Sequence, residues 1–237
     1  MRRLASLFAL VLCAALPRSA QACGLSPPIG PNGLPTVCHG DESELRIRAG
    51  LTAGGTSTRI DFGDTTADLL QAAATATVDV LPLERLSLSA AFGASLGGHV
   101  DYLGQRYSLQ PGPIGGVGVS YRFFGGAAPF VHTSFTFSLA RSRTRAEDGS
   151  EADFDSRDWR FGLAAGKTLG EHVAPFAVAR YFGAGTNWSV GGGKGADHYR
   201  YHVGVGSAFG FSDHVDGLVE VAFLGERRAS IGVGYLF

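Results

Sequence analysis

The chain ends on a seven-residue stretch in which apolar residues alternate with small ones: Ile231-Gly232-Val233-Gly234-Tyr235-Leu236-Phe237. Side chains of a β-strand point alternately to its two faces, so the odd-numbered residues of this stretch would share one face. That face is wholly apolar and ends in two aromatic rings, while the opposite face consists mainly of glycine. The stretch therefore predicts a terminal strand with one apolar and one small-residue face.

The same alternation recurs upstream, from about residue 43 onward. Segments of about ten residues place Leu, Val, Ala and Phe on one face and Gly, Ser, Thr and charged residues on the other, which indicates strands. Besides the terminal strand, such segments lie near residues 44–53, 70–80, 86–96, 116–123, 131–139, 159–166, 175–183, 199–209 and 219–223. We therefore predict an all-β fold of about ten antiparallel strands, with eight as the alternative number.

The segment at 175–183 leaves its orientation open, because both of its faces are apolar. One face carries Ala177, Ala179 and Tyr181, and the other carries Phe176, Val178 and Phe182. We favour the first set as part of the apolar face, because that choice turns Arg180 to the polar face.

The predicted connections alternate in length. Short ones fall near 81–85, 124–129, 169–174 and 211–215, and long polar ones fall near 54–67, 98–111, 142–157 and 183–197, with a tight last one near 224–228. This rhythm is typical of an up-and-down barrel whose two rims differ.

The first 42 residues have a different character. Residues 1–22 combine Arg2 and Arg3, an apolar centre and a small-residue cleavage site, which is the pattern of a secretory signal peptide. Residues 23–42 are an irregular leader rich in Pro and Gly, and the barrel is predicted to span residues 43–237. Cys23 and Cys38 are expected to form a disulfide in an exported chain, with lipidation of Cys23 as the alternative.

The composition excludes several classes of protein. Charged residues make up 17% of the chain, below the roughly 25% of an ordinary soluble domain. The formal net charge is −1 and no basic cluster occurs, so we expect no nucleic-acid partner. The hydrophobic fraction of 45% is too high for a disordered chain.

The composition of the polar face indicates that this face lines the lumen of a barrel. Its charged members are Arg46, Arg48, Asp79, Arg122, Arg160, Arg200 and Glu220. A soluble surface would carry many lysines, whereas this chain has only Lys167 and Lys194. Aromatic residues gather near the ends of the predicted strands, where a membrane barrel has its interfacial girdles.

The alternating ending, with Ile231, Val233, Tyr235 and Phe237 on one face, resembles the C-terminal assembly signal of bacterial outer-membrane barrels. With the signal peptide and the ten segments, the whole mature chain resembles the small barrels of the OmpA/OmpX/OmpW-like superfamily. The resemblance implies an antiparallel up-and-down transmembrane β-barrel in the outer membrane of a Gram-negative bacterium. It also implies contacts with outer-membrane lipid and, through the C-terminal strand, with the barrel-assembly machinery.

No zinc-binding spacing, P-loop, nucleotide fingerprint or nucleophile elbow occurs in the chain. We predict that the protein is not an enzyme and that it holds no cofactor and no metal. The predicted function is a structural role or an interaction of its long loops with an external ligand. Eight to ten strands leave an interior that side chains nearly fill, so the lumen is expected to be largely plugged by ion pairs. The alternative is a narrow anion or small-solute channel lined by arginines.

Two short patterns raise further hypotheses. His132 and Ser134, with Glu147 as an acid, resemble the His-x-Ser spacing of outer-membrane lipid A deacylases, so a lipid A-modifying hydrolase is a third function. Against it, Phe135 stands where an Asn normally follows the Ser, and both residues fall on the predicted lumen face. The acidic residues between Asp148 and Asp158 could hold a cation, but their spacing is not that of a calcium loop. A solvated loop with internal ion pairs is the favoured interpretation.

Overall fold

The computed structural model describes residues 24–26, 36–38, 46–83, 85–124, 129–169, 172–212 and 214–237. The predicted signal peptide and Cys23 lie outside the described residues. The strands are β1 (Gly24–Ser26), β2 (Thr36–Cys38), β3 (Arg46–Phe62), β4 (Thr65–Leu83), β5 (Leu86–Tyr102), β6 (Gln105–Leu109), β7 (Gly112–Phe124), β8 (Pro129–Arg145), β9 (Glu151–Lys167), β10 (Val173–Trp188), β11 (Gly193–Asp197), β12 (Tyr201–Gly210), β13 (Val215–Gly225) and β14 (Arg227–Leu236). Among the described residues no helix is long and apolar enough to cross a membrane.

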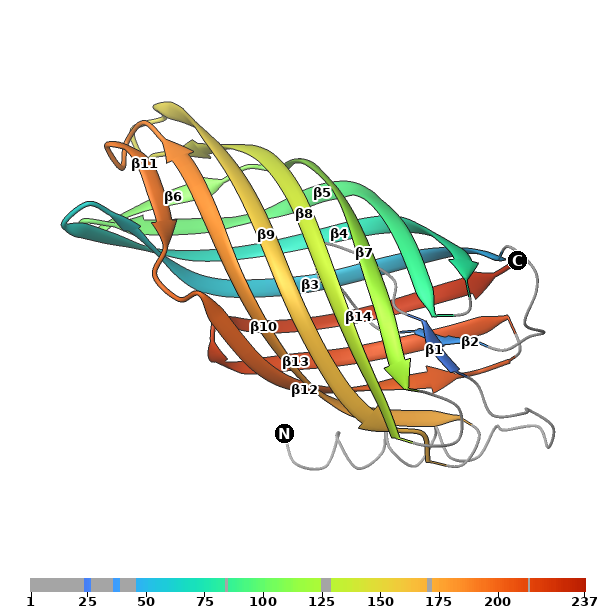
Figure 1. The fold of residues 1–237 in the computed structure, drawn as a ribbon. Helices are drawn as coiled ribbons and strands as arrows, with labels where there is room; N and C mark the ends of the chain where they lie inside the picture. Colours follow the sequence, from blue (N-terminus) through green and yellow to red (C-terminus); the bar gives the residue numbers. More distant parts are fainter. Residues whose placement is uncertain are drawn as a thin grey trace, which may run out of the picture.

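Strands β3 to β14 form one antiparallel sheet that closes into a barrel, as Figure 1 shows. The last strand closes the ring, because β14 pairs with β3 from Arg227 opposite Ser57 to Leu236 opposite Arg48. Closure of this kind leaves no unpaired strand edge. The two-stranded sheet of β1 and β2 is separate and lies beside β12 and β13, at the end of the barrel that holds the C terminus.

Two wall strands are each divided into two labelled parts. Both β6 and β7 pair with β5, and the break between them falls at Gln110 and Pro111, where proline lacks the N–H that a sheet needs. Both β11 and β12 pair with β10, with a break at residues 198–200. Counted as continuous wall strands, the barrel therefore has ten, which confirms the predicted fold class and favours ten strands over eight.

The predicted long loops are wrong. Their residues continue the strands, which reach 19 residues in β4 and meet in tight turns at 63–64, 103–104, 146–150 and 189–192. Leu103 and the glycines Gly63, Gly104 and Gly192 have positive φ in these turns. The four hairpins on this side thus form a regular wall in place of loops.

The reason for this error lies in the polarity of the two faces along each strand. In β3 the inward residues run from Arg48 and Thr52 to Ile60 and Phe62, so the interior changes from polar to apolar. The outward residues change in the opposite sense, from apolar residues to Arg59 and Asp61. The alternation of side chains is unbroken, but the faces exchange polarity, so a search for one continuous apolar face loses the strand at the exchange.

Around the part of the wall nearer the C terminus, the outward residues form a continuous apolar band. Leu51, Phe92 and Ile231 are each about 60% exposed there. On β8 this face runs from Val131 to Leu139, which at about 3.3 Å per residue and a tilt of about 40° gives a height of roughly 23 Å. That height matches the hydrocarbon core that outer-membrane barrels cross.

The orientation of β10 follows the favoured assignment. Ala177, Ala179 and Tyr181 are exposed on the band, whereas Val178, Arg180 and Phe182 are buried inside. The four residues of the predicted C-terminal signal, Ile231, Val233, Tyr235 and Phe237, are likewise exposed on the outer face.

We call the wall beyond the apolar band the extension; it comprises residues 59–68, 99–109, 141–157 and 185–197. The hairpin of β13 and β14 turns at Glu226 and does not reach it. There β11 pairs directly with β3, with Asp197 opposite Ile60. The wall therefore has ten strands around the band and eight around the extension.

Candidate functional site

The interior holds three layers of side chains. Apolar residues fill the extension, charged residues fill the middle of the barrel inside the apolar band, and a second apolar cluster around Phe130, Phe176 and Leu218 lies nearer the C-terminal rim. These layers are built mainly by the inward positions of the wall strands.

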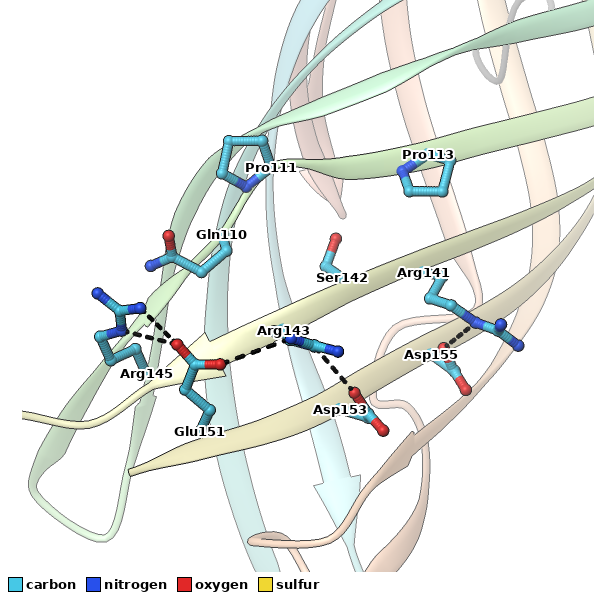
Figure 2. Close-up of a pocket in the computed structure, with 10 residues that line it drawn as sticks. All are labelled: Gln110, Pro111, Pro113, Arg141, Ser142, Arg143, Arg145, Glu151, Asp153 and Asp155. Carbon is cyan, nitrogen blue, oxygen red and sulfur yellow. Dashed lines mark hydrogen bonds and ion pairs between the residues drawn. The ribbon is translucent and has the colours of Figure 1, made fainter. Parts of the chain in front are cut away.

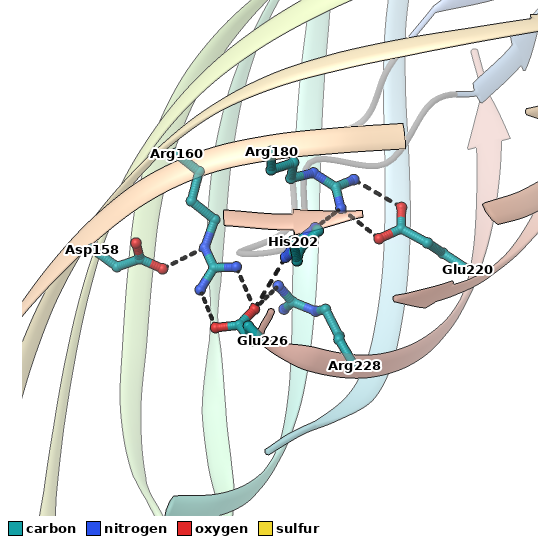
Figure 3. A network of polar contacts seen from close by, with 7 residues as sticks. All are labelled: Asp158, Arg160, Arg180, His202, Glu220, Glu226 and Arg228. Atoms are coloured by element: carbon teal, nitrogen blue, oxygen red, sulfur yellow. Dashed lines mark hydrogen bonds and ion pairs between the residues drawn. The ribbon is translucent and has the colours of Figure 1, made fainter. Parts of the chain in front are cut away.

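The first polar cluster is centred on Glu226 at the tip of the β13–β14 hairpin (Figure 3). Arg160 of β9 donates two hydrogen bonds to its carboxylate, at 2.6 and 3.0 Å, and a third to Asp158. Arg228 approaches the same carboxylate at 3.8 Å. The guanidinium of Arg160 also lies over the Phe182 ring, 4.5 Å from its centroid, which adds a cation–π contact.

His202 connects this cluster to a second ion pair. Arg180 donates to both oxygens of Glu220, at 2.5 and 2.8 Å, and lies 2.8 Å from Nε2 of His202. An arginine can only donate, so Nε2 is the acceptor and Nδ1 carries the proton. That nitrogen faces Glu226 at 3.4 Å, so a neutral His202 bridges the two carboxylate clusters.

A third cluster lies nearer the C-terminal end of the barrel. Arg48 of β3 donates to Asp216 of β13 at 2.8 and 2.5 Å, and to Asp79 of β4 at 3.1 Å. All three side chains are almost fully buried. Buried charges of this kind are stable only when they are paired. Arg48, Arg160 and Arg180 each bind a carboxylate that comes from a strand or turn not adjacent to their own, so the pairs connect separate parts of the wall.

The structure places five of the seven predicted lumen charges inside the barrel: Arg48, Asp79, Arg122, Arg160 and Glu220. It brings Arg48 and Asp79 together and puts Arg160 and Glu220 in separate clusters that His202 connects. The side chain of Arg46 lies outside the described residues.

The prediction for Arg200 is wrong. Its side chain is exposed and borders a groove beside Trp159 and Tyr181 of the outer surface. Strand β12 begins only at Tyr201, so the alternation that was extended to Arg200 does not hold across the break at 198–200.

Sequence reasoning missed several members of the network: Asp158, Asp216, Glu226 and Arg228. The alternation of β9 and β14 continues through Asp158 and Arg228. A pattern that allows the two faces of a strand to exchange polarity would therefore have predicted these two residues. Glu226 lies in a turn, and the alternation of strand residues cannot predict that a side chain at the tip of a hairpin points into the barrel.

The apolar layer of the extension is centred on Trp188, whose indole is 1% exposed. Its ring contacts come from four other strands, with centroid distances of 5.7 Å to Phe62, 5.4 Å to Tyr102, 5.1 Å to Tyr107 and 6.0 Å to Phe154. Its Nε1 donates to Oγ1 of Thr144 at 2.8 Å, so the indole is satisfied inside the barrel. Beneath it, a small cavity of about 110 Å³ borders Asp158, Arg160 and Glu226.

His132 and Ser134 do not form a triad with Glu147. Both are buried on the inner face of β8, near the C-terminal end of the wall, whereas Glu147 lies in the turn at the far end of the same strand. About twelve residues of extended strand separate Ser134 from that turn, a distance of roughly 40 Å.

The outer surface of the extension carries ion pairs in place of apolar residues. Across β8 and β9, Arg141, Arg143 and Arg145 stand directly opposite Asp155, Asp153 and Glu151, as Figure 2 shows. Hydrogen bonds from Arg145, together with its charge and that of Arg143, lower the pKa of Glu151. The same arrangement recurs as Arg59 with Asp68 and Arg106 with Asp101. Glu151, Asp153 and Asp155 thus form the expected internal ion pairs, but they do so on strand β9 and not in a solvated loop, and Asp158 pairs with Arg160 inside the barrel. The described residues contain no cluster of three or more His, Cys, Asp or Glu side chains that could hold a metal ion.

No protein-family model matches the chain, and no curated protein matches it. Solved structures of similar fold include the translocator domain of the autotransporter NalP from Neisseria meningitidis, at 13% identity and a TM-score of 0.49 over 83% of this chain and 89% of that one. The outer membrane protein OprG from Pseudomonas aeruginosa gives 14% identity and a TM-score of 0.44, over 84% and 99%. An outer membrane channel from Pseudomonas putida F1 gives 9% and 0.44, over 84% and 97%.

The closed wall, the apolar band and the polar interior of this chain decide its class. The fold is that of an outer-membrane β-barrel. Barrels of this type cross the outer membrane of Gram-negative bacteria, which is the localisation predicted from the sequence.

Proposed function

We propose that the protein is a closed, non-enzymatic outer-membrane barrel that acts through the outer surface of its extension. The observation that carries the proposal is the Trp188 cluster, in which rings from β3, β5, β6, β9 and β10 meet inside the eight-stranded end of the barrel. An eight-stranded wall is just wide enough for side chains to fill, so such a cluster leaves no aqueous path.

The charges inside the band support a plug more than an anion channel. Among the described residues the inward charges there are Arg48, Arg122, Arg160, Arg180 and Arg228 with Asp79, Asp158, Asp216, Glu220 and Glu226. These five carboxylates equal the five arginines in number, and Asp197 borders the same cavity as Asp158 and Glu226, so the interior presents no ring of uncompensated positive charge. A selective anion pore needs such a ring.

The extension is the part of the barrel that would meet a partner. Its hairpins are held by cross-strand ion pairs and by the apolar core inside, so they present a rigid surface where flexible loops were expected. Its outward face is polar and stands beyond the apolar band, away from the C-terminal end (Figure 1). Outer-membrane barrels have short connections on the periplasmic side of the apolar band and longer segments on the extracellular side. The extension stands far beyond the band, so in this proposal it faces the outside of the cell.

Solute flux through proteoliposomes tests the closed state. Vesicles that contain the folded wild-type barrel should release chloride and small sugars no faster than empty vesicles. Trp188→Ala removes the side chain at the centre of the cluster and should raise the flux, whereas the matched change Trp159→Ala, on the outer face, should not. Rapid release by the wild type would contradict the proposal.

A further inference from the structure

A groove of about 400 Å³ crosses the outer surface where the apolar band meets the extension. Its floor is β10, one wall is β9, and the other is the break between β11 and β12. The residues that shape it are Arg157, Trp159, Tyr181, Gly183, Gly185 and Arg200.

Two glycines make the floor of the groove. Gly183 stands opposite Trp159 and Gly185 stands opposite Arg157 in the pairing of β9 with β10. A Cβ atom at Gly183 would lie 2.9 Å from Nε1 of Trp159, so the indole rests directly on the backbone of β10. At Gly185 a Cβ atom would meet nothing within 4 Å, so the groove is open there.

The groove joins two kinds of surface. Trp159 and Tyr181 lie at the upper edge of the apolar band, with ring centroids 5.6 Å apart, and Phe137 continues this aromatic wall into the band. Tyr and Trp prefer this level of a membrane, where the rings contact acyl chains and headgroups together.

The two arginines of the groove differ from those of the neighbouring ladder. Arg141, Arg143 and Arg145 each form an ion pair with a carboxylate. Within the part of the chain that the structure describes, neither Arg157 nor Arg200 takes part in an ion pair. Among the described residues that line the groove, Asp197 is the one carboxylate, so the groove carries an excess of positive charge at the level of lipid headgroups.

We propose that this groove binds a phosphorylated glycolipid of the outer leaflet, with a phosphate between Arg157 and Arg200 and an acyl chain along Trp159 and Tyr181. Guanidinium groups bind phosphate oxygens through paired N–H donors, and basic pockets at the edge of a membrane bind lipid headgroups. The proposal rests on the proposed position of the barrel, with its extension at the outer side of the membrane.

Native mass spectrometry of the folded barrel in detergent tests the proposal, with bis-phosphorylated lipid A and its dephosphorylated form as probes. The wild type should retain the phosphorylated lipid, and Arg157→Gln/Arg200→Gln should bind it at least tenfold more weakly. Arg141→Gln/Arg143→Gln, which removes the same charge from the ladder, should bind like the wild type. Equal binding by the groove variant, or equal binding of the dephosphorylated lipid, would overturn the proposal.

A second variant leaves every charge in place. Gly185→Leu fills the open part of the floor and should also abolish retention of the lipid. Inorganic phosphate at equal concentration should not displace the lipid. Displacement would mean that the groove binds any small anion, and it would overturn the proposal of a glycolipid site. Solute flux measured on the same preparations separates the two proposals, because the groove variants should leave the barrel closed.

Discussion

At the scale of single residues, the Arg180–Glu220 pair is the most sensitive contact of the interior. Glu220→Ala removes the carboxylate that binds the guanidinium through two hydrogen bonds and leaves a buried positive charge. Loss of one partner of a buried pair costs about 3–5 kcal/mol of folding free energy. Urea unfolding of the refolded barrel in detergent should show a loss of this size.

The double variant Glu220→Ala/Arg180→Met is the control for this prediction. It removes the uncompensated charge as well as the pair, so it should be more stable than the single variant. Equal or additive loss in the double variant would mean that the pair contributes little.

Asp197 gives a second prediction at this scale. It lies in β11, within the extension, and its burial raises its pKa to about 7, with the carboxylates of Asp158 and Glu226 acting in the same sense. Because the folded state favours the protonated form, the stability that this group contributes is greatest below pH 4 and is lost as the pH rises through 7. The thermal midpoint should therefore be lower at pH 8 than at pH 5.

Asp197→Asn should flatten this pH dependence, since the amide is neutral at both values. The matched variant Asp155→Asn, on the outer ladder, should leave the difference between the two pH values unchanged. An undiminished difference in the Asp197 variant would assign the pH dependence to another group.

At the scale of elements, the strands show what periodicity can and cannot predict. Alternation predicts the ten segments, the orientation of β10 and the outward face of β14, because successive side chains of a strand point to opposite faces. The extension does not follow, because its apolar side chains point inward and its charges point outward. The network is only partly accessible to such reasoning, since Glu226 reaches it from a turn.

The C-terminal strand gives a prediction for assembly. Phe237 is exposed, its N–H donates to the carbonyl of Ile47, and its ring packs against Tyr235 at 4.9 Å. If this strand is recognised by the assembly machinery, Phe237→Ala should lower the amount of heat-modifiable barrel in the outer membrane several-fold. Phe211→Ala, an exposed aromatic residue near the same rim, should insert normally, and equal insertion of both variants would contradict recognition through Phe237.

At the scale of the whole molecule, the structure resembles two barrels joined end to end. One part has ten strands, an apolar exterior, and an interior of paired charges closed at its C-terminal end by the apolar cluster of Phe130 and Phe176. The other part has eight strands, an apolar interior and a charged exterior. The short β13–β14 hairpin produces the change in strand number, and its tip supplies the carboxylate at the boundary. This arrangement suits a protein that crosses a membrane and continues into water as a rigid body.

The orientation of the two parts can be checked on intact cells. Asp148→Cys places a thiol in the turn of the extension, and Ser212→Cys places one in the connection at the opposite rim. A membrane-impermeant maleimide should label the first variant and spare the second until the outer membrane is permeabilised. The reverse labelling pattern would mean that the extension faces the periplasm and would contradict the proposed orientation.

The central claim is that the folded barrel is closed, and single-channel recording in a planar bilayer tests it most directly. The wild-type protein, shown to be folded by heat-modifiable migration on a gel, should insert without discrete conductance steps at any salt concentration. Regular steps from that preparation, above all steps with a preference for anions, would contradict the closed barrel and make the lumen arginines the lining of an open path.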